Sequence, residues 1–111
     1  MATYVDDMHL SPMGAIGGLR LCHMIADTPT ELHGMAMKIR LDRRWLHGDH
    51  YDVPDAKRAL AVKYGAIEVS MRQLAALAFL QRMGQPLGAP ETAIERMRTW
   101  KNSAGAQPSP E

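Results

Sequence analysis

The sequence predicts a small α/β protein, a single-domain sheet of about three to four short strands with three to four helices. Segments with strand-like composition alternate along the chain with segments that carry the 3.6-residue apolar period of helices. Two Ser/Thr-x-x-Glu/Gln sequences mark helix starts. The length of 111 residues suits one domain. These three observations together favour one layered α/β unit.

In the first half of the chain, residues 3–5 form a predicted strand that runs into two aspartates. A loop rich in Pro and Gly follows over 11–18, and residues 19–26, apolar on both faces, read as an interior strand. Thr28-Pro29-Thr30-Glu31 combines a cap, a first-turn proline and a capping-box glutamate. We expect a helix from this point to about Arg40.

In the middle of the chain, 43–46 is expected to form another short strand, and the polar segment 47–52 is expected to interrupt regular structure. Asp52 or Val53 is the expected cap of the next helix, with Pro54 in its first turn. That helix should end at Gly65.

The remaining elements are a strand over 66–69, a helix opened by the Ser70–Gln73 capping box and ended by Gly84, and a last helix over 91–100. Residues 102–111 lack large apolar side chains and are expected to be a disordered tail. The predicted domain therefore covers 1–101, with 85–101 as a C-terminal helical extension.

Composition excludes several classes of protein. Hydrophobic residues make up 46% and charged residues 23%, which argues against disorder, collagen and coiled coil. The longest apolar run, 74–80, is far shorter than the roughly 20 residues of a membrane span. The start of the chain has no signal-peptide pattern, and the single cysteine, Cys22, suits a reducing compartment. We expect a cytoplasmic protein with no membrane partner.

The net charge of +1 gives no bulk signature of nucleic-acid binding. Chemistry concentrates instead in 47–52, His-Gly-Asp-His-Tyr-Asp, which holds two imidazoles, two carboxylates and a phenol. A parallel sheet would bring the carboxylates that follow the first strand to the same edge. Asp6, Asp49 and Asp52 are therefore candidate metal ligands, and carboxylates favour Mg²⁺ or Mn²⁺ over Zn²⁺. No paired CxxC and no HExxH zinc spacing is present in the sequence.

Two further groups complete the predicted site. The candidate catalytic residues are His50, as base or ligand, together with Asp49 and His23. The candidate ligand-binding residues are Arg43, Arg44, Tyr51 and His33, because arginine binds phosphate through two parallel hydrogen bonds. A structural interpretation stays open for all of them: Asp52 caps a helix, His50 and Tyr51 hydrogen-bond a loop, and the arginines are solvated.

An ordered set of short motifs resembles the bacterial and phage domain of unknown function numbered four thousand and thirty-one, over about residues 3–75. The motifs are Val-Asp (5–6), Cys-His-Met-Ile-Ala-Asp-Thr (22–28), Glu-Leu-His (31–33), Asp-His-Tyr-Asp-Val-Pro (49–54), Lys-Arg-Ala-Leu-Ala (57–61) and Gly-Ala (65–66). The resemblance carries no established activity. It implies that a set of polar residues belongs to a shared pattern: His23, Asp27, His33, Asp49, His50, Tyr51 and Asp52.

A weaker likeness, at the level of the fold, connects the chain to PIN-like nucleases, which hold Mg²⁺ or Mn²⁺ on clustered carboxylates and cut RNA or DNA. That likeness implies Asp6, Asp49 and Asp52 as ligands, with Glu31 as a fourth. The chain is short for that fold, and its histidines have no role in the usual mechanism of those enzymes. The likeness is an analogy of fold only.

The sequence thus favours a metal-dependent hydrolase or nuclease that acts on phosphoesters, in nucleic acid or a nucleotide, with a His/Asp site at 47–52. The alternative is an accessory module that binds a nucleotide or a protein without turnover. A third interpretation is an interaction protein in which 47–52 is a capped turn. A divalent metal and a phosphate-containing ligand are the expected partners of the first.

Overall fold

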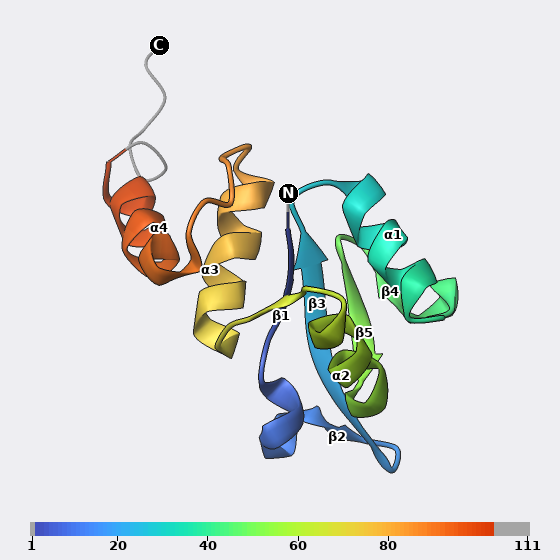
Figure 1. Ribbon diagram of the computed structural model, residues 1–111. Helices are drawn as coiled ribbons and strands as arrows, with labels where there is room; N and C mark the ends of the chain where they lie inside the picture. The colour runs from blue at the N-terminus through green and yellow to red at the C-terminus, as the bar shows by residue number, and fades with distance from the viewer. Residues whose placement is uncertain (1, 104–111) are drawn as a thin grey trace.

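The computed structural model describes residues 2–103, which form a mixed α/β fold with six strands and four α-helices (Figure 1). The strands are β1 (Thr3–Val5), β2 (Ala15–Ile16), β3 (Leu19–Ala26), β4 (Leu46–His47), β5 (His50–Pro54) and β6 (Ile67–Glu68). The helices are α1 (Pro29–Lys38), α2 (Asp55–Lys63), α3 (Met71–Arg82) and α4 (Ala93–Asn102). Four 3-10 turns join them: η1 (Met8–Leu10), η2 (Pro12–Gly14), η3 (Arg43–Trp45) and η4 (Pro90–Thr92). The predicted fold class is confirmed, with more strands than the sequence indicates.

The sheet is built around β3, and its strand order is β4-β5-β3-β1-β6, with β2 paired to the start of β3. The central strand runs antiparallel to both β1 and β5, and only the β1–β6 pair is parallel within the described residues. The prediction that a parallel sheet gathers the carboxylates at one edge is therefore wrong. They meet instead because neighbouring antiparallel strands place residues side by side.

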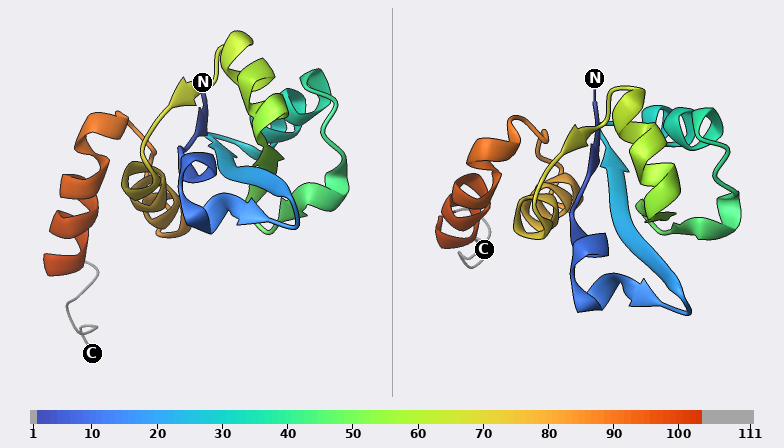
Figure 2. Two further views of the ribbon diagram at one scale, coloured as in Figure 1. Left: turned by 90° about the horizontal axis from the view of Figure 1, so that it is seen from below. Right: turned by 60° about the horizontal axis from the view of Figure 1, so that its bottom comes forward.

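Helices cover both faces of the sheet (Figure 2). One face packs against α1 and α2, and its core includes Cys22, Met24 and Tyr51. The other face packs against α3, and α4 lies along the outside of α3 (Figure 1). Tyr4 and Ile25 face this second core. Residues on β3 therefore alternate between two buried layers, which explains why its sequence is apolar on both faces.

Two of the three predicted helix caps are confirmed. The Thr28 hydroxyl accepts a hydrogen bond from the backbone N–H of Glu31, and Ser70 and Gln73 form a reciprocal capping box. The start predicted for the middle helix is wrong. Pro54 is the N-cap of α2, and residues 52–53 belong to β5. The carboxylate of Asp52 therefore does not cap a helix, and it projects from the sheet.

The segment around residues 43–54 differs most from prediction. Residues 43–45 form the turn η3 in place of a strand, and β4 follows them. The polar segment 47–52 is a β-hairpin, closed by a two-residue turn in which Gly48 has a φ of 66°. A glycine at the first position of a two-residue turn matches the right-handed twist of a hairpin. Regular secondary structure therefore continues through the polar segment 47–52, which was predicted to interrupt it.

The C-terminal helical extension is present as η4 and α4, which ends one residue beyond the predicted boundary at 101. Of the predicted disordered tail, residues 104–111 lie outside the described residues. Across residues 2–103, no helix has the length and apolar character needed to span a membrane.

Candidate metal centre

Polar side chains form a row across three strands on the α3 side of the sheet. The backbone N–H of Asp6, directly after β1, donates to the carbonyl of His23 on β3, and His23 pairs in register with Asp52 on β5. His50 lies two residues before Asp52 and so projects from the same face. The side chains of cross-strand partners approach closely. Four groups from three separate segments of the sequence are therefore neighbours.

Three of these side chains converge. His23, His50 and Asp52 each offer one ligand atom, and these atoms all lie within 4.8 Å of one another. The His50 Nε2 is 3.6 Å from Asp52 Oδ1, and the His23 and His50 rings meet edge to face at 5.2 Å between centroids. Two imidazoles and one carboxylate around a common point are suited to hold a divalent transition-metal ion. We call these three residues the His-His-Asp triad.

The far nitrogen of His23 is held by a buried carboxylate. Asp6 is 1% exposed and its Oδ2 lies 2.8 Å from His23 Nδ1. Its Oδ1 accepts the backbone N–H groups of His23 and Met8. Burial alone would raise the pKa of Asp6, but these hydrogen bonds outweigh burial and hold the pKa below its usual value. The Asp6 bond likewise raises the pKa of His23, against the opposing effect of burial.

The second imidazole has a comparable support. Asp49 Oδ1 lies 3.2 Å from His50 Nδ1, and the Nε of Arg82 on α3 donates to Asp49 Oδ2 at 2.9 Å. Partial burial would raise the pKa of Asp49, yet the bonds from Arg82 and His50 hold it below the usual value. Carboxylates that bind the outer nitrogen of a metal-ligating histidine fix its tautomer and orientation. Asp6 and Asp49 therefore support the triad and do not join it.

His47 is a site residue that the sequence reasoning did not single out. Its Nε2 lies 3.1 Å from Asp52 Oδ2, the second oxygen of the triad carboxylate, and its side chain is 58% exposed. It pairs with His50 across the β4–β5 hairpin. The signal was present in the sequence, because Gly-Asp between two strand segments is a hairpin pattern that places the flanking residues opposite each other.

A cavity of about 320 Å³ opens between α3 and the two histidines of the triad. His23, His50, Asp6, Asp49 and Arg82 are its polar lining, and the rest of the lining is apolar. A neighbouring cavity of about 390 Å³, at the start of α1, shares Asp49 and Arg82 with it. The candidate metal ligands therefore adjoin a concave surface of ligand size.

The predicted ligand-binding residues lie elsewhere. Tyr51 projects from β5 toward α1, on the opposite face from the triad, and its hydroxyl is 2.8 Å from His33 Nδ1. Arg43 Nη2 lies 3.3 Å from His33 Nε2, and Arg44 rests over the ring of Trp45. The structure thus brings these residues to one another and not to His50.

Other candidates are also separate from the triad. Glu31 lies at the start of α1, where its carboxylate accepts the Thr28 hydroxyl. Arg58 Nε donates to the Asp6 carbonyl and Arg58 Nη1 pairs with Glu68, so it supports the chain behind Asp6. Cys22 projects into the opposite core from its neighbour His23, as strand alternation requires. His23 is therefore not placed to act as a base for the Cys22 thiol, although the two residues are adjacent in the sequence.

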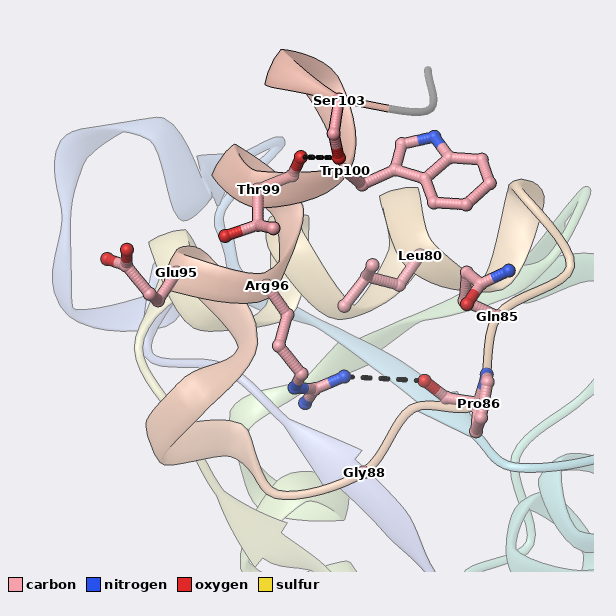
Figure 3. Close-up of a pocket in the computed structure, with 9 residues that line it drawn as sticks. All are labelled: Leu80, Gln85, Pro86, Gly88, Glu95, Arg96, Thr99, Trp100 and Ser103. Carbon is pink, nitrogen blue, oxygen red and sulfur yellow. Dashed lines mark hydrogen bonds between the residues drawn. The ribbon is translucent and has the colours of Figure 1, made fainter.

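A larger cavity, of about 520 Å³, lies between the end of α3 and α4 (Figure 3). Arg96 crosses it and donates to the carbonyls of Pro86 and Ala89, holding the loop between the two helices. Glu95 pairs with Arg98 along α4. Arg96 and Glu95 thus serve the fold, and no group of metal ligands adjoins this cavity among residues 2–103.

Comparison with known proteins gives one finding. A family model described as protein of unknown function (DUF4031) matches residues 3–81, which is more than half of the chain and ends within α3. No curated protein and no solved structure matches the chain significantly. The matched range contains every residue of the triad and both supporting carboxylates.

Proposed function

The chain belongs to the family described as protein of unknown function (DUF4031), and we propose that it is a metal-dependent hydrolase that acts on phosphoesters. The observation that carries this proposal is the His-His-Asp triad beside a cavity. An ion held by three protein ligands keeps coordination positions open, and such an ion lowers the pKa of a bound water and polarises a phosphoryl oxygen.

The donor set decides the class of metal. The sequence favoured Mg²⁺ or Mn²⁺ because it supplied three carboxylates, but Asp6 and Asp49 hydrogen-bond the two histidines. Two imidazole nitrogens and one carboxylate suit Zn²⁺, Fe²⁺ or Mn²⁺ better than Mg²⁺. We therefore propose a first-row transition metal, with Zn²⁺ bound more tightly than Mn²⁺ and Mg²⁺ weakest.

The residues around the triad fit hydrolysis. Water adds to phosphorus, the ester P–O bond breaks, and the proton released by the water passes to the leaving alcohol. His47 lies against Asp52 and faces solvent, so it is placed to accept the proton from the water and release it to solvent, from which the leaving alkoxide is protonated. Arg82 has only its Nε in a hydrogen bond among the described residues, which leaves its terminal nitrogens to bind phosphate oxygens.

Isothermal titration of the metal-free full chain tests the metal site. We expect one equivalent of Zn²⁺ to bind, with Mn²⁺ weaker and Mg²⁺ weakest. His50→Ala and Asp52→Ala should each weaken Zn²⁺ by about 10-fold or more, because each removes one of three ligands. His33→Ala is the matched control, since this imidazole contacts Tyr51 and Arg43 and does not belong to the triad. Equal Zn²⁺ affinity in all four proteins contradicts the proposal.

Turnover of p-nitrophenyl phosphate by the metal-loaded chain tests the reaction. We expect metal-dependent release of p-nitrophenol that is lost in Asp52→Ala. At saturating Zn²⁺, His47→Ala should lower kcat by about 100-fold, the usual contribution of a positioned acid or base. Zn²⁺ binding without turnover of any phosphoester would favour the alternative function, a module that binds a nucleotide or a protein.

A further inference from the structure

We propose that the substrate is a phosphate monoester of a small apolar alcohol, whose apolar part occupies the cavity between the triad and α3. This inference rests on the proposed function and names its substrate class. The phosphoryl group would lie between the triad and Arg82, and the alcohol would point toward the apolar wall of the cavity.

The apolar wall comes from three elements. Met8 and Met13 approach from the η1–η2 segment, Ile25 from β3, and Leu74 and Ala75 from α3. Methionine side chains are flexible and polarisable, so they adapt to the shape of an apolar ligand and favour aromatic rings. Such a lining has no polar partner for a second charged group, but burial of a hydrocarbon group against it is favourable.

The size of the cavity limits the ligand. About 320 Å³ lies at the lower end of the range for small-molecule sites, which is roughly 300–1,000 Å³. A single ring or a short branched chain fits this space together with a phosphate at the mouth. A mononucleotide would need polar partners for its base and sugar, and the apolar wall does not provide them.

Charge supports the same conclusion. Arg82 is the one arginine or lysine among the described residues that line this cavity, and its side chain is 58% exposed at the rim. Asp6 and Asp49 lie on the same lining, so two carboxylates accompany this single arginine. A nucleic-acid strand binds through rows of basic side chains that neutralise successive phosphates. One arginine beside a metal ion suits a single phosphate.

Binding of two phosphonates with the same charged group tests the inference. Phenylphosphonate and methylphosphonate are titrated into the Zn²⁺-loaded full chain, and both resist hydrolysis. We expect phenylphosphonate to bind about 10-fold more tightly or better, because only its ring buries apolar surface. Benzyl alcohol, which has the ring without the charge, should bind more weakly than either.

Variants locate the effect in the cavity. Ala75 is exposed on α3 and lines the cavity, so Ala75→Leu fills the space without disturbing the buried core. It should remove the preference for phenylphosphonate and leave Zn²⁺ affinity unchanged. Ala59→Leu, the same change at an exposed position of α2, is the matched control. Arg82→Gln should weaken the binding of both phosphonates and leave the ratio of their two affinities unchanged.

The outcomes separate the two proposals. Failure of Zn²⁺ to bind overturns both the proposed function and the substrate class. Zn²⁺ binding with equal affinity for the two phosphonates overturns the substrate class alone, and so does a preference that survives in Ala75→Leu. Tighter binding of a short oligonucleotide than of phenylphosphonate overturns the substrate class in favour of nucleic acid.

Discussion

Asp6 is a buried carboxylate that connects the fold to the site. It is 1% exposed, it accepts two backbone N–H groups, and its other oxygen holds His23 Nδ1. A buried ion of this kind is tolerated only because its hydrogen bonds are complete. By holding Nδ1 of His23, Asp6 fixes the orientation of this ring, which belongs to the triad. The buried carboxylate therefore also orients a residue of the proposed metal site.

We predict that Asp6→Asn weakens Zn²⁺ binding by about 10- to 100-fold, because the imidazole loses its ionised partner. It should also lower the free energy of unfolding by about 1–3 kcal/mol, because an amide cannot satisfy the same donors. Titration calorimetry and urea unfolding of the metal-free chain measure the two effects.

Asp49→Asn is the matched comparison, because Asp49 holds His50 in the same way but is 35% exposed. It should weaken Zn²⁺ binding by the same factor as Asp6→Asn, and it should change the free energy of unfolding by less than about 1 kcal/mol. Equal losses of stability in the two variants would contradict the role given to the burial of Asp6.

At the scale of elements, the β4–β5 hairpin positions His47 and His50. Its turn requires Gly48 at a φ of 66°, a conformation that costs other residues roughly 1–2 kcal/mol. We predict that Gly48→Ala lowers the free energy of unfolding by about 1 kcal/mol. It should also weaken Zn²⁺ binding, because His50 follows the turn closely.

Gly34→Ala is the control, because it should change the free energy of unfolding in the opposite direction. Gly34 lies within α1, its φ is not positive, and an added Cβ would meet no atom within 4 Å. Alanine there should raise the free energy of unfolding by about 0.5–1 kcal/mol, because glycine is the weaker helix former. Urea unfolding of both variants tests the pair, and a loss of stability at both positions would contradict this account of the turn.

The sequence predicted the elements whose signals are local. The capping residues Thr28 and Ser70 gave two helix starts, and the apolar run of β3 gave the central strand. The prediction of Asp52 as a helix cap was wrong. Asp before Val-Pro is a capping pattern, and only the pairing of β5 with β3 shows that this residue lies in a strand. Pairing is a long-range property, since it depends on which strand His23 meets.

In the site, too, the local signals were predicted and the long-range contacts were not. The residues of the triad, His23, His50 and Asp52, were all named from the sequence, but their convergence on one point was not predicted. Asp6 and Asp49 became supporting groups only through the cross-strand register. Because side chains alternate along β5, Tyr51 projects from the other face, where its hydroxyl contacts His33 and His33 in turn contacts Arg43. One residue of register decides which face a side chain occupies.

At the scale of the whole molecule, Cys22 reports whether α1 and α2 stay packed against the sheet. It lies on β3 with no exposed surface, and burial, aided by the charge of Asp6, raises the pKa of its thiol to about 12. At pH 9 a free thiol is largely ionised, whereas the folded Cys22 is about 0.1% thiolate. Reaction with iodoacetamide therefore requires the sheet to open.

We predict that iodoacetamide modifies Cys22 of the native chain at pH 9 at least about 1,000-fold more slowly than an exposed thiol, because only the thiolate reacts. Modification should appear in urea together with the loss of far-ultraviolet circular dichroism. A thiol introduced by Ser103→Cys, at an exposed position after α4, provides the fast reference in the same molecule. Mass spectrometry of the two peptides measures both rates. Comparable rates in the native chain would mean that β3 opens locally, and the two layers would then not unfold as one cooperative unit.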